Sequence, residues 1–223
     1  MKENKIDNVK RFLFMLLGNY CIGLASAIFR TADFGTDPFT CMNLGISSHL
    51  PISYGTYQML VNLVLFVPVI ILARESFGAG CLVNMLGIGY ISDFMVFVFG
   101  KLGLSIESIH AYIPLRIVLV FVALLILGFG CGVYMECHMG ASPYDMIPQI
   151  IEDKSKGRFR FKWARVMDDL ICLTIGFLTG ARVQFATIIV AFGTGPLFAF
   201  FRGKIAKRIV PEYTKEVLKN SFE

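Results

Sequence analysis

Three stretches of 19 or more residues contain no Asp, Glu, Lys or Arg, and they constrain the fold more than any other feature. They are residues 38–73, 117–135 and 183–201. Runs of about 18 or more apolar residues predict membrane-spanning helices, because that length crosses the hydrocarbon core. Hydrophobic residues make up 56% of the 223 residues and charged residues only 17%, whereas soluble domains carry roughly 25% charged residues. We therefore predict an all-α polytopic membrane protein, and exclude a soluble globule, a disordered chain and a nucleic-acid binder.

Basic residues gather in three short polar segments, which are residues 1–11, residues 154–165 and the tail from Arg202. Most of the 21 Lys and Arg residues lie in these segments. Cytoplasmic loops of membrane proteins carry an excess of Lys and Arg, so all three segments are predicted to be cytoplasmic. We expect a multi-pass protein of the plasma membrane, surrounded by the lipid bilayer, with its N- and C-termini in the cytoplasm.

The sequence lacks the motifs that carry enzyme chemistry. Its six cysteines lie mostly within apolar runs and form no C-x-x-C pair, a pattern typical of small buried side chains rather than of metal ligands. No H-E-x-x-H, nucleophilic G-x-S-x-G or P-loop motif is present. We therefore expect no cofactor, no metal and no enzymatic activity.

The sequence contains one unit twice. Residues 34–39 (FGTDPF) match residues 139–144 (MGASPY) at an offset of 105, and the offset becomes 106 further along the chain. An internal repeat of this kind indicates a duplicated structural unit. The matched pairs include Gly35 and Gly140, Pro38 and Pro143, Phe39 and Tyr144, and Asn62 and Asp168.

Each copy is predicted to hold a long helix, a short helix and two more long helices. Both short helices begin with the same signal, since Asp37 or Ser142 stands at the N-cap and a proline follows at the first helical position. The six long transmembrane helices are predicted over residues 12–30, 54–73, 77–99, 113–135, 163–180 and 183–201, and the two short helices over 37–50 and 142–152. The chain divides into a cytoplasmic N-terminus (1–11), a first repeat (12–100), a connecting loop (101–114), a second repeat (115–202) and a basic cytoplasmic tail (203–223).

Two membrane topologies fit this pattern. If the short helices enter the membrane and return to the same side, each copy crosses three times and the copies are inverted. If the short helices cross as tilted, thin spans, each copy crosses four times and the copies are parallel. The inverted topology places Arg74 inside and Lys101, Arg116 and Arg182 outside. The parallel topology reverses all four, and the excess of cytoplasmic basic residues slightly favours it.

Six segments carry the most distinctive patterns of the chain. They are ADFGTDPF, ISYGTYQMLVNLVLF and GAGCLVNMLGIGYISDF in the first copy, and MGASPYD, ARVMDDLICL and AFGTGPL in the second. In order and spacing they resemble the YczE/YyaS/YitT family of multi-pass bacterial membrane proteins over residues 12–202. The resemblance is closest to the YczE-like branch, because only a short polar segment follows Phe201 where YitT-like members carry a soluble domain. It implies a polytopic helical fold in the plasma membrane and supplies no substrate.

The first candidate site is formed by the starts of the two short helices. A helix N-terminus presents unpaired N–H groups and a partial positive charge, and inside a bilayer such ends commonly face transported substrates. Gly35 and Gly140 are expected to shape the turns before Asp37 and Ser142. The alternative is that Asp37 and Ser142 only cap their own helices.

The second candidate is Asp168 with its repeat mate Asn62. A carboxylate within a membrane span is costly, so it is expected to face a partner or a water-filled cavity. Its role there would be ion coupling or proton transfer. The alternative is a position near the lipid headgroups, where Arg165 pairs with Asp168 as a helix neighbour.

These observations favour a small secondary transporter, or permease, for an unknown small solute or ion. The alternative is a non-transporting membrane subunit that scaffolds or regulates a partner complex. Small pseudo-symmetric units often pair, so a homodimer is a further expectation, and no nucleic-acid partner is expected. The predicted substrate-binding residues, at the interface between the repeats, are Asp37, Ser142, Gly35, Gly140, Asn62 and Asp168.

Overall fold

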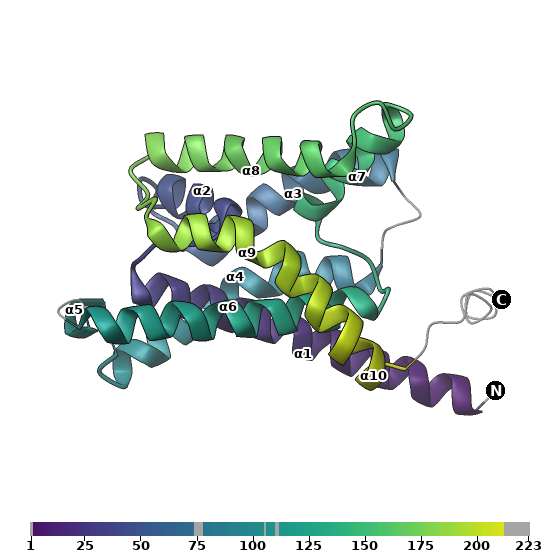
Figure 1. Cartoon of the computed structure of the whole chain (residues 1–223), viewed down its shortest axis with the longest axis horizontal. Coiled ribbons are helices and arrows are strands. Elements are labelled where there is room, and N and C mark those ends of the chain that lie inside the picture. The colour runs from purple at the N-terminus through teal and green to yellow at the C-terminus, as the bar shows by residue number, and fades with distance from the viewer. Residues whose placement is uncertain (1, 74–77, 105, 110–111, 212–223) are drawn as a thin grey trace.

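The computed structural model describes residues 2–73, 78–104, 106–109 and 112–211. These residues form helices and their connections (Figure 1), and no β-strand occurs among them. Arg74 and residues 212–223 of the predicted tail lie outside the described residues. The predicted all-α class is confirmed.

The helix bounds lie close to the predicted ones, with differences at both ends of the chain. The first helix begins at Lys2, because no Gly or Pro interrupts its polar start, and the last long helix continues beyond Phe201 through a π-helical turn at Arg202–Ala206. The long helices are α1 (Lys2–Ala32), α3 (Tyr54–Leu72), α4 (Ala79–Lys101), α6 (Ile113–Glu136), α8 (Phe161–Leu178) and α9 (Phe185–Phe201). The short ones are α2 (Pro38–Ser47), α5 (Ile106–Ile109), α7 (Pro143–Lys154) and α10 (Lys207–Ile209).

Four of the described helices, α1, α3, α4 and α6, are long and apolar enough to cross a membrane. The other two long helices differ from them for separate reasons. Helix α8 contains Lys162, Arg165, Asp168 and Asp169 within 18 residues, and α9 has only 17 residues. Membrane crossing by α8 and α9 therefore stays a prediction.

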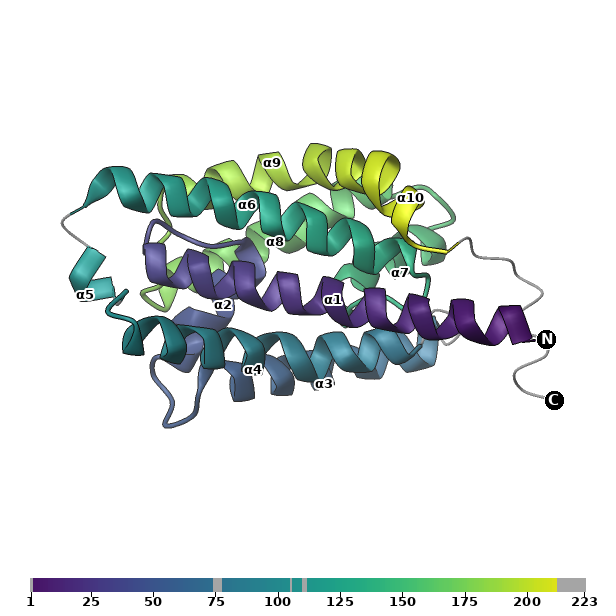
Figure 2. The same ribbon diagram turned by 90° about the horizontal axis from the view of Figure 1, so that it is seen from below.

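The two halves of the chain run in opposite directions along the long axis (Figures 1 and 2). Helices α1 and α6 are antiparallel and pack side by side, and α3 and α8, and α4 and α9, are likewise opposed. The start of α1, the connection between α7 and α8 and the described end of the chain share one end of the bundle. These directions are those of the inverted alternative.

The short helices run outward from the middle of the bundle. Helix α2 packs along α8, and after it His49 contacts the backbone oxygen of Thr179 at the far end of α8, with 2.9 Å between Nε2 and O. Helix α7 leads instead to the end where α8 begins. The N-terminal ends of both short helices are therefore turned toward the middle.

Reciprocal backbone hydrogen bonds join the two halves. The N–H of Gly80, in the first turn of α4, donates to the carbonyl of Met139 at 2.7 Å. The N–H of Ala186, in the first turn of α9, donates to the carbonyl of Phe34 at 3.0 Å. Gly80 and Ala186 are 106 residues apart, and Phe34 and Met139 are 105 apart, so the two bonds connect positions that the predicted repeat offsets match.

The crossing of α1 and α6 provides a test of the packing. A Cβ added at Gly130 would lie 2.9 Å from the Gly18 carbonyl oxygen and 2.9 Å from Cys21 Cβ, whereas nothing lies within 4 Å of a Cβ at Gly100. Alanine favours a helix over glycine by about 1 kcal/mol. We expect Gly130→Ala to lower the melting temperature of the detergent-purified protein nonetheless, and Gly100→Ala to leave it unchanged or raise it. Equal melting temperatures for the two variants would contradict the close approach of α1 and α6.

Candidate functional site

The start of α2 is built from a left-handed turn and a side-chain cap. Gly35 has φ +103°, and a Cβ there would clash with Thr187 Oγ1, so only glycine fits without strain. Asp37 occupies the N-cap, where its Oδ1 accepts the N–H of Thr40 at 3.0 Å. Pro38 follows at the first helical position. Asp37 therefore caps α2 as the sequence predicts.

The start of α7 repeats this backbone but not the cap. Gly140 has φ +101°, and Ser142 occupies the N-cap position. The Ser142 side chain makes no capping hydrogen bond, so the predicted cap is wrong in this respect. Asp145, in the first turn, instead places a negative charge near the partial positive charge of the helix start.

Two aromatic rings connect the starts of the short helices. Phe39 of α2 stacks on Tyr144 of α7, with 4.4 Å between the ring centroids and 22° between the ring planes. Both rings are buried and cluster with Cys172 of α8. Phe39 and Tyr144 are the residues that the predicted repeat matches with each other, and their contact joins the two halves of the chain.

An ion-pair cluster lies beside this stack. Arg165 of α8 donates through Nη1 to Asp145 Oδ1 at 2.5 Å, and its Nε lies 3.4 Å from Asp169 Oδ2. Tyr144 donates its hydroxyl to Asp169 Oδ1 at 2.6 Å, and the guanidinium carbon of Arg165 lies 4.6 Å from the centre of the Tyr144 ring. Asp37 is within electrostatic range of Arg165 and Asp169. We call Asp37, Tyr144, Asp145, Arg165, Asp168 and Asp169 the central cluster.

Asp168 and Asn62 carry unpaired oxygens. Arg165 pairs with Asp169, four residues on, rather than with Asp168 as the sequence alternative supposed. Asp168 Oδ2 is buried and has no hydrogen-bond partner. Asn62 is 1% exposed, donates from Nδ2 to the Gln58 carbonyl at 3.0 Å and leaves Oδ1 unpaired.

The structure thus brings most of the predicted residues to one region and adds others. The turns at Gly35 and Gly140, with Asp37 and Ser142, lie on either side of the aromatic stack, and Asp168 lies in the central cluster. The residues that were not among those predicted for the site are Arg165, Asp145, Asp169, Phe39 and Tyr144. Two signals point to them, namely the spacing of four between Arg165 and Asp169 and the matched aromatic positions after the two N-cap residues.

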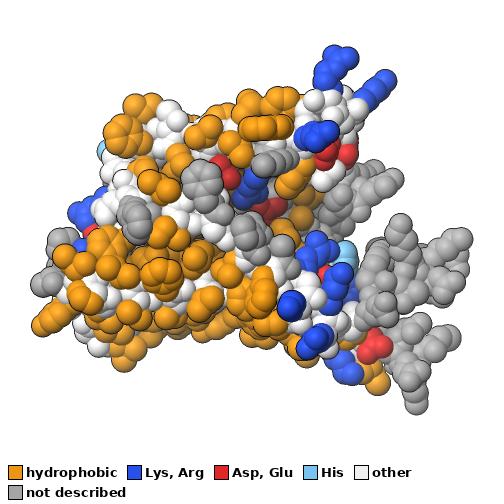
Figure 3. Space-filling view, viewed as in Figure 1, with side chains coloured by type: hydrophobic (Ala, Val, Ile, Leu, Met, Phe, Trp, Pro, Cys, Tyr) orange, Lys and Arg blue, Asp and Glu red, His pale blue; other side chains and the backbone are white. Residues whose placement is uncertain are grey.

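The central cluster is partly open on one side. The side chains of Arg165, Asp145 and Asp169 are 31%, 28% and 21% exposed. Figure 3 shows acidic and basic atoms in the middle of a face that is otherwise largely apolar. Charged groups within a membrane bundle commonly line substrate or ion pathways, so the cluster is suited to binding a charged or polar solute. Among the described residues, no group of His, Cys, Asp or Glu side chains has an arrangement that would hold a metal ion.

A second ion pair lies within the first half of the chain. Arg30 of α1 donates to Asp93 Oδ1 at 2.8 Å, and Asp93 Oδ2 accepts the N–H of Gly55 at 2.7 Å. Arg30 also lies over the ring of Tyr54, 4.3 Å from its centre. Both carboxylate oxygens of Asp93 are thereby paired, so this group fastens α1, α3 and α4 together.

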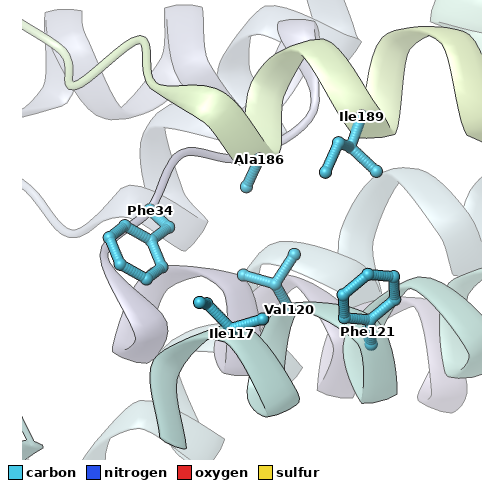
Figure 4. Close-up of a pocket in the computed structure, with 6 residues that line it drawn as sticks. All are labelled: Phe34, Ile117, Val120, Phe121, Ala186 and Ile189. Carbon is cyan, nitrogen blue, oxygen red and sulfur yellow. The ribbon is translucent and has the colours of Figure 1, made fainter. Parts of the chain in front are cut away.

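A small cavity lies away from the central cluster, between α6 and α9 (Figure 4). Its volume is about 140 Å³, and its lining exposes no polar surface. Such a cavity offers nothing to orient a polar solute, so it is not the candidate site. It is lined by Phe34, Ile117, Val120, Phe121, Ala186 and Ile189.

Comparison with known proteins gives a family but no activity. The family of unknown function DUF6198 matches residues 9–203. The uncharacterized membrane protein YczE of Bacillus subtilis is 26% identical over 199 residues, covering 88% of this chain and 87% of that protein. An uncharacterized protein of Haemophilus influenzae is 25% identical, covering 89% and 86%, and the uncharacterized protein YyaS of B. subtilis is 22% identical, covering 75% and 81%. No solved structure matches. The resemblance to the YczE/YyaS proteins is confirmed.

A double-mutant cycle tests whether Arg165 and Asp145 interact. Arg165→Met leaves Asp145 and Asp169 without their cation, so we expect it to destabilise the protein more than Asp145→Asn does. Residues in direct contact couple by about 0.5–3 kcal/mol, measured as unfolding free energy in detergent. The control is the cycle of Lys10→Met and Asp7→Asn, an exposed pair 3.8 Å apart for which we expect much weaker coupling. If Arg165 and Asp145 couple no more strongly than this exposed pair, the ion pair is contradicted.

Proposed function

The chain belongs to the family of unknown function DUF6198, and we propose that it is a secondary transporter of a small solute or ion. The stack of Phe39 on Tyr144 carries this proposal, because it brings the starts of two short helices together beside the central cluster. Short, discontinuous helices whose N-terminal ends meet near the middle of a membrane bundle form the binding sites of many transporters. The proposed site comprises Asp37, Ser142, Gly35, Gly140, Asn62 and Asp168, extended by Arg165, Asp145 and Asp169.

We further propose that the two halves are an inverted repeat in which all six long helices cross the membrane. The opposed helix directions and the reciprocal bonds of Gly80 and Ala186 support it. So does the closely similar backbone at Gly35 and Gly140. In this arrangement α2 and α7 re-enter from opposite sides. Helix α8 crosses because Arg165 and Asp169 turn toward the central cluster, where Arg165 pairs with carboxylates.

The plasma membrane is the proposed location, with the N- and C-termini in the cytoplasm. The membrane-protein relative and the four apolar helices support a membrane location. The start of α1 and the basic 154–165 segment lie at the same end of the bundle. This arrangement supports a cytoplasmic position for both termini. The homodimer remains part of the proposal, and no enzymatic role is proposed.

Cysteine labelling in intact bacteria separates the inverted from the parallel topology. Lys101 lies at the end of α4, opposite the end that holds the exposed Arg158. We expect a membrane-impermeant maleimide to label Lys101→Cys from outside, above the background of the wild-type chain. Arg158→Cys should react only after the membrane is permeabilised. Protection of both positions in intact cells would contradict the inverted topology.

Uptake into proteoliposomes tests transport across a broad set of solutes at once. Vesicles that contain the protein and empty vesicles are incubated with a defined mixture of metabolites and ions, and the trapped solutes are measured by mass spectrometry. We expect at least one solute to accumulate only with the protein, and Asp37→Asn or Asp168→Asn to reduce its uptake about tenfold or more, as expected for loss of an interaction worth roughly 1.4 kcal/mol.

The control for these variants is Asp7→Asn, which makes the same change at an exposed residue outside the bundle core and is expected to leave uptake unchanged. Undiminished uptake in Asp37→Asn and Asp168→Asn would remove the site. Equal solute uptake by vesicles with and without the protein would favour the membrane-subunit alternative. That alternative predicts stoichiometric co-purification with another membrane protein.

A further inference from the structure

The unpaired buried oxygens around the short helices are all hydrogen-bond acceptors. On α2, α3 and α8, the described side-chain atoms that are buried without a partner are Asn43 Oδ1, Gln58 Oε1, Asn62 Oδ1 and Asp168 Oδ2. Asn43 and Asn62 are 0% and 1% exposed. Each donates from Nδ2 to a backbone carbonyl of its own helix, at 2.9 Å for Asn43 and 3.0 Å for Asn62, which turns the amide oxygen away from that bond.

These oxygens belong to helices that pack on one another around the aromatic stack. Helix α2 packs on α8 and α3, and Val61 and Leu65 of α3 contact the cluster of Phe39, Tyr144 and Cys172. Asn62 lies on the same face of α3 as Leu65 and Val69, and Val69 packs against α7 at Met146. Asn62 therefore lies on the face of α3 that contacts α7 at Val69 and α4 at Gln58, whose Oε1 is close to Gly89. A buried acceptor without a donor is unfavourable, so a ligand that donates hydrogen bonds is favoured there.

The charge balance of the central cluster points the same way. Asp37, Asp145, Asp168 and Asp169 supply four carboxylates, and Arg165 supplies the guanidinium that pairs with two of them. With all groups of the cluster ionised, its formal charge is −3. A net charge of this size within a membrane bundle is unfavourable unless it is neutralised, and a cationic ligand would lower that cost.

An anion is not favoured by the helix starts themselves. Helix N-termini attract anions, but both starts already have a carboxylate of the protein, Asp37 at the N-cap of α2 and Asp145 in the first turn of α7. Arg165 also displays the kind of group that the cluster accepts. Its guanidinium lies over the Tyr144 ring and contacts two carboxylates, which is a cation–π contact combined with charge-assisted hydrogen bonds.

We propose that the central cluster, together with Asn43 and Asn62, binds a cation that donates hydrogen bonds, of the protonated-amine or guanidinium class. The unpaired acceptor oxygens accept its N–H groups, the carboxylates balance its charge, and the partly exposed side chains of Arg165, Asp145 and Asp169 give it access. This inference rests on the proposed transport site, and it names the chemistry of the solute.

Two cations of equal charge test the requirement for donors. Methylammonium carries three N–H groups, and tetramethylammonium carries none. At equal chloride concentration, we expect methylammonium to raise the melting temperature of the detergent-purified protein and tetramethylammonium to raise it much less. The proposal would be overturned if the two cations stabilise the protein equally, or if none of the tested ions stabilises it. It would also be overturned if sodium alone stabilises the protein, or if acetate stabilises it while methylammonium has no effect.

Variants assign the effect to the site. We expect Asp168→Asn and Asn62→Leu to lose the methylammonium shift and the exposed-site control Asp7→Asn to retain it. If the two site variants do not purify, the wild-type chain provides a second measurement. Methylammonium is then expected to slow the alkylation of Cys172 severalfold, because Cys172 contacts Tyr144. The alkylation rate of Cys137 is expected to stay unchanged. Equal alkylation rates at Cys172 with and without methylammonium would contradict the site.

This binding test and the uptake test fail independently. Methylammonium binding without uptake of any solute would leave the ligand class intact and remove the transport function. Uptake of a neutral or anionic solute, with no stabilisation by methylammonium, would retain transport and overturn the ligand class.

Discussion

The contact between the two short-helix starts governs the arrangement of charge in this protein. The stack of Phe39 on Tyr144 brings two partial positive charges together inside an apolar bundle, which is unfavourable without compensation. Asp37 and Asp145 provide negative charge at these ends. Arg165 then balances Asp145 and Asp169. The positions of Asp37, Asp145 and Arg165 are therefore suited to the meeting of the two helix starts.

Small residues allow the surrounding helices to hold this contact in place. Helices in a membrane gain little from apolar burial against one another, so close backbone packing has a larger share in their association. A Cβ at Gly130 would meet the backbone of α1, and a Cβ at Gly55 would lie 2.7 Å from the backbone of Gly89 in α4. The reciprocal bonds of Gly80 and Ala186 add fixed points between the halves.

The sequence predicts the helices well and the pairs between them poorly. Charge-free runs, the proline after each N-cap and the repeat offset depend on local or periodic patterns, so they place α2 at Pro38 and α7 at Pro143 to within a residue. The partner of Arg165 depends on tertiary geometry, because Asp145 is 20 residues away on another helix. Ser142 has the right residue type for a cap, but its hydroxyl makes no such bond, and no local pattern distinguishes it from Asp37.

The two halves share a backbone plan but not its chemistry. In the first half Arg30, Asp93 and the N–H of Gly55 join α1, α3 and α4 into a closed group. At the repeat offsets, Met135 matches Arg30 and Phe161 matches Gly55. The second half therefore lacks this cation, and the Phe161 side chain leaves no room for the close backbone contact that Gly55 makes. Its own cation, Arg165, instead holds Asp145 and Asp169, and all three side chains are partly exposed. The two halves thus have similar turns at the starts of their short helices. In the first half the charged group joins three helices, and in the second half Arg165 holds partly exposed carboxylates.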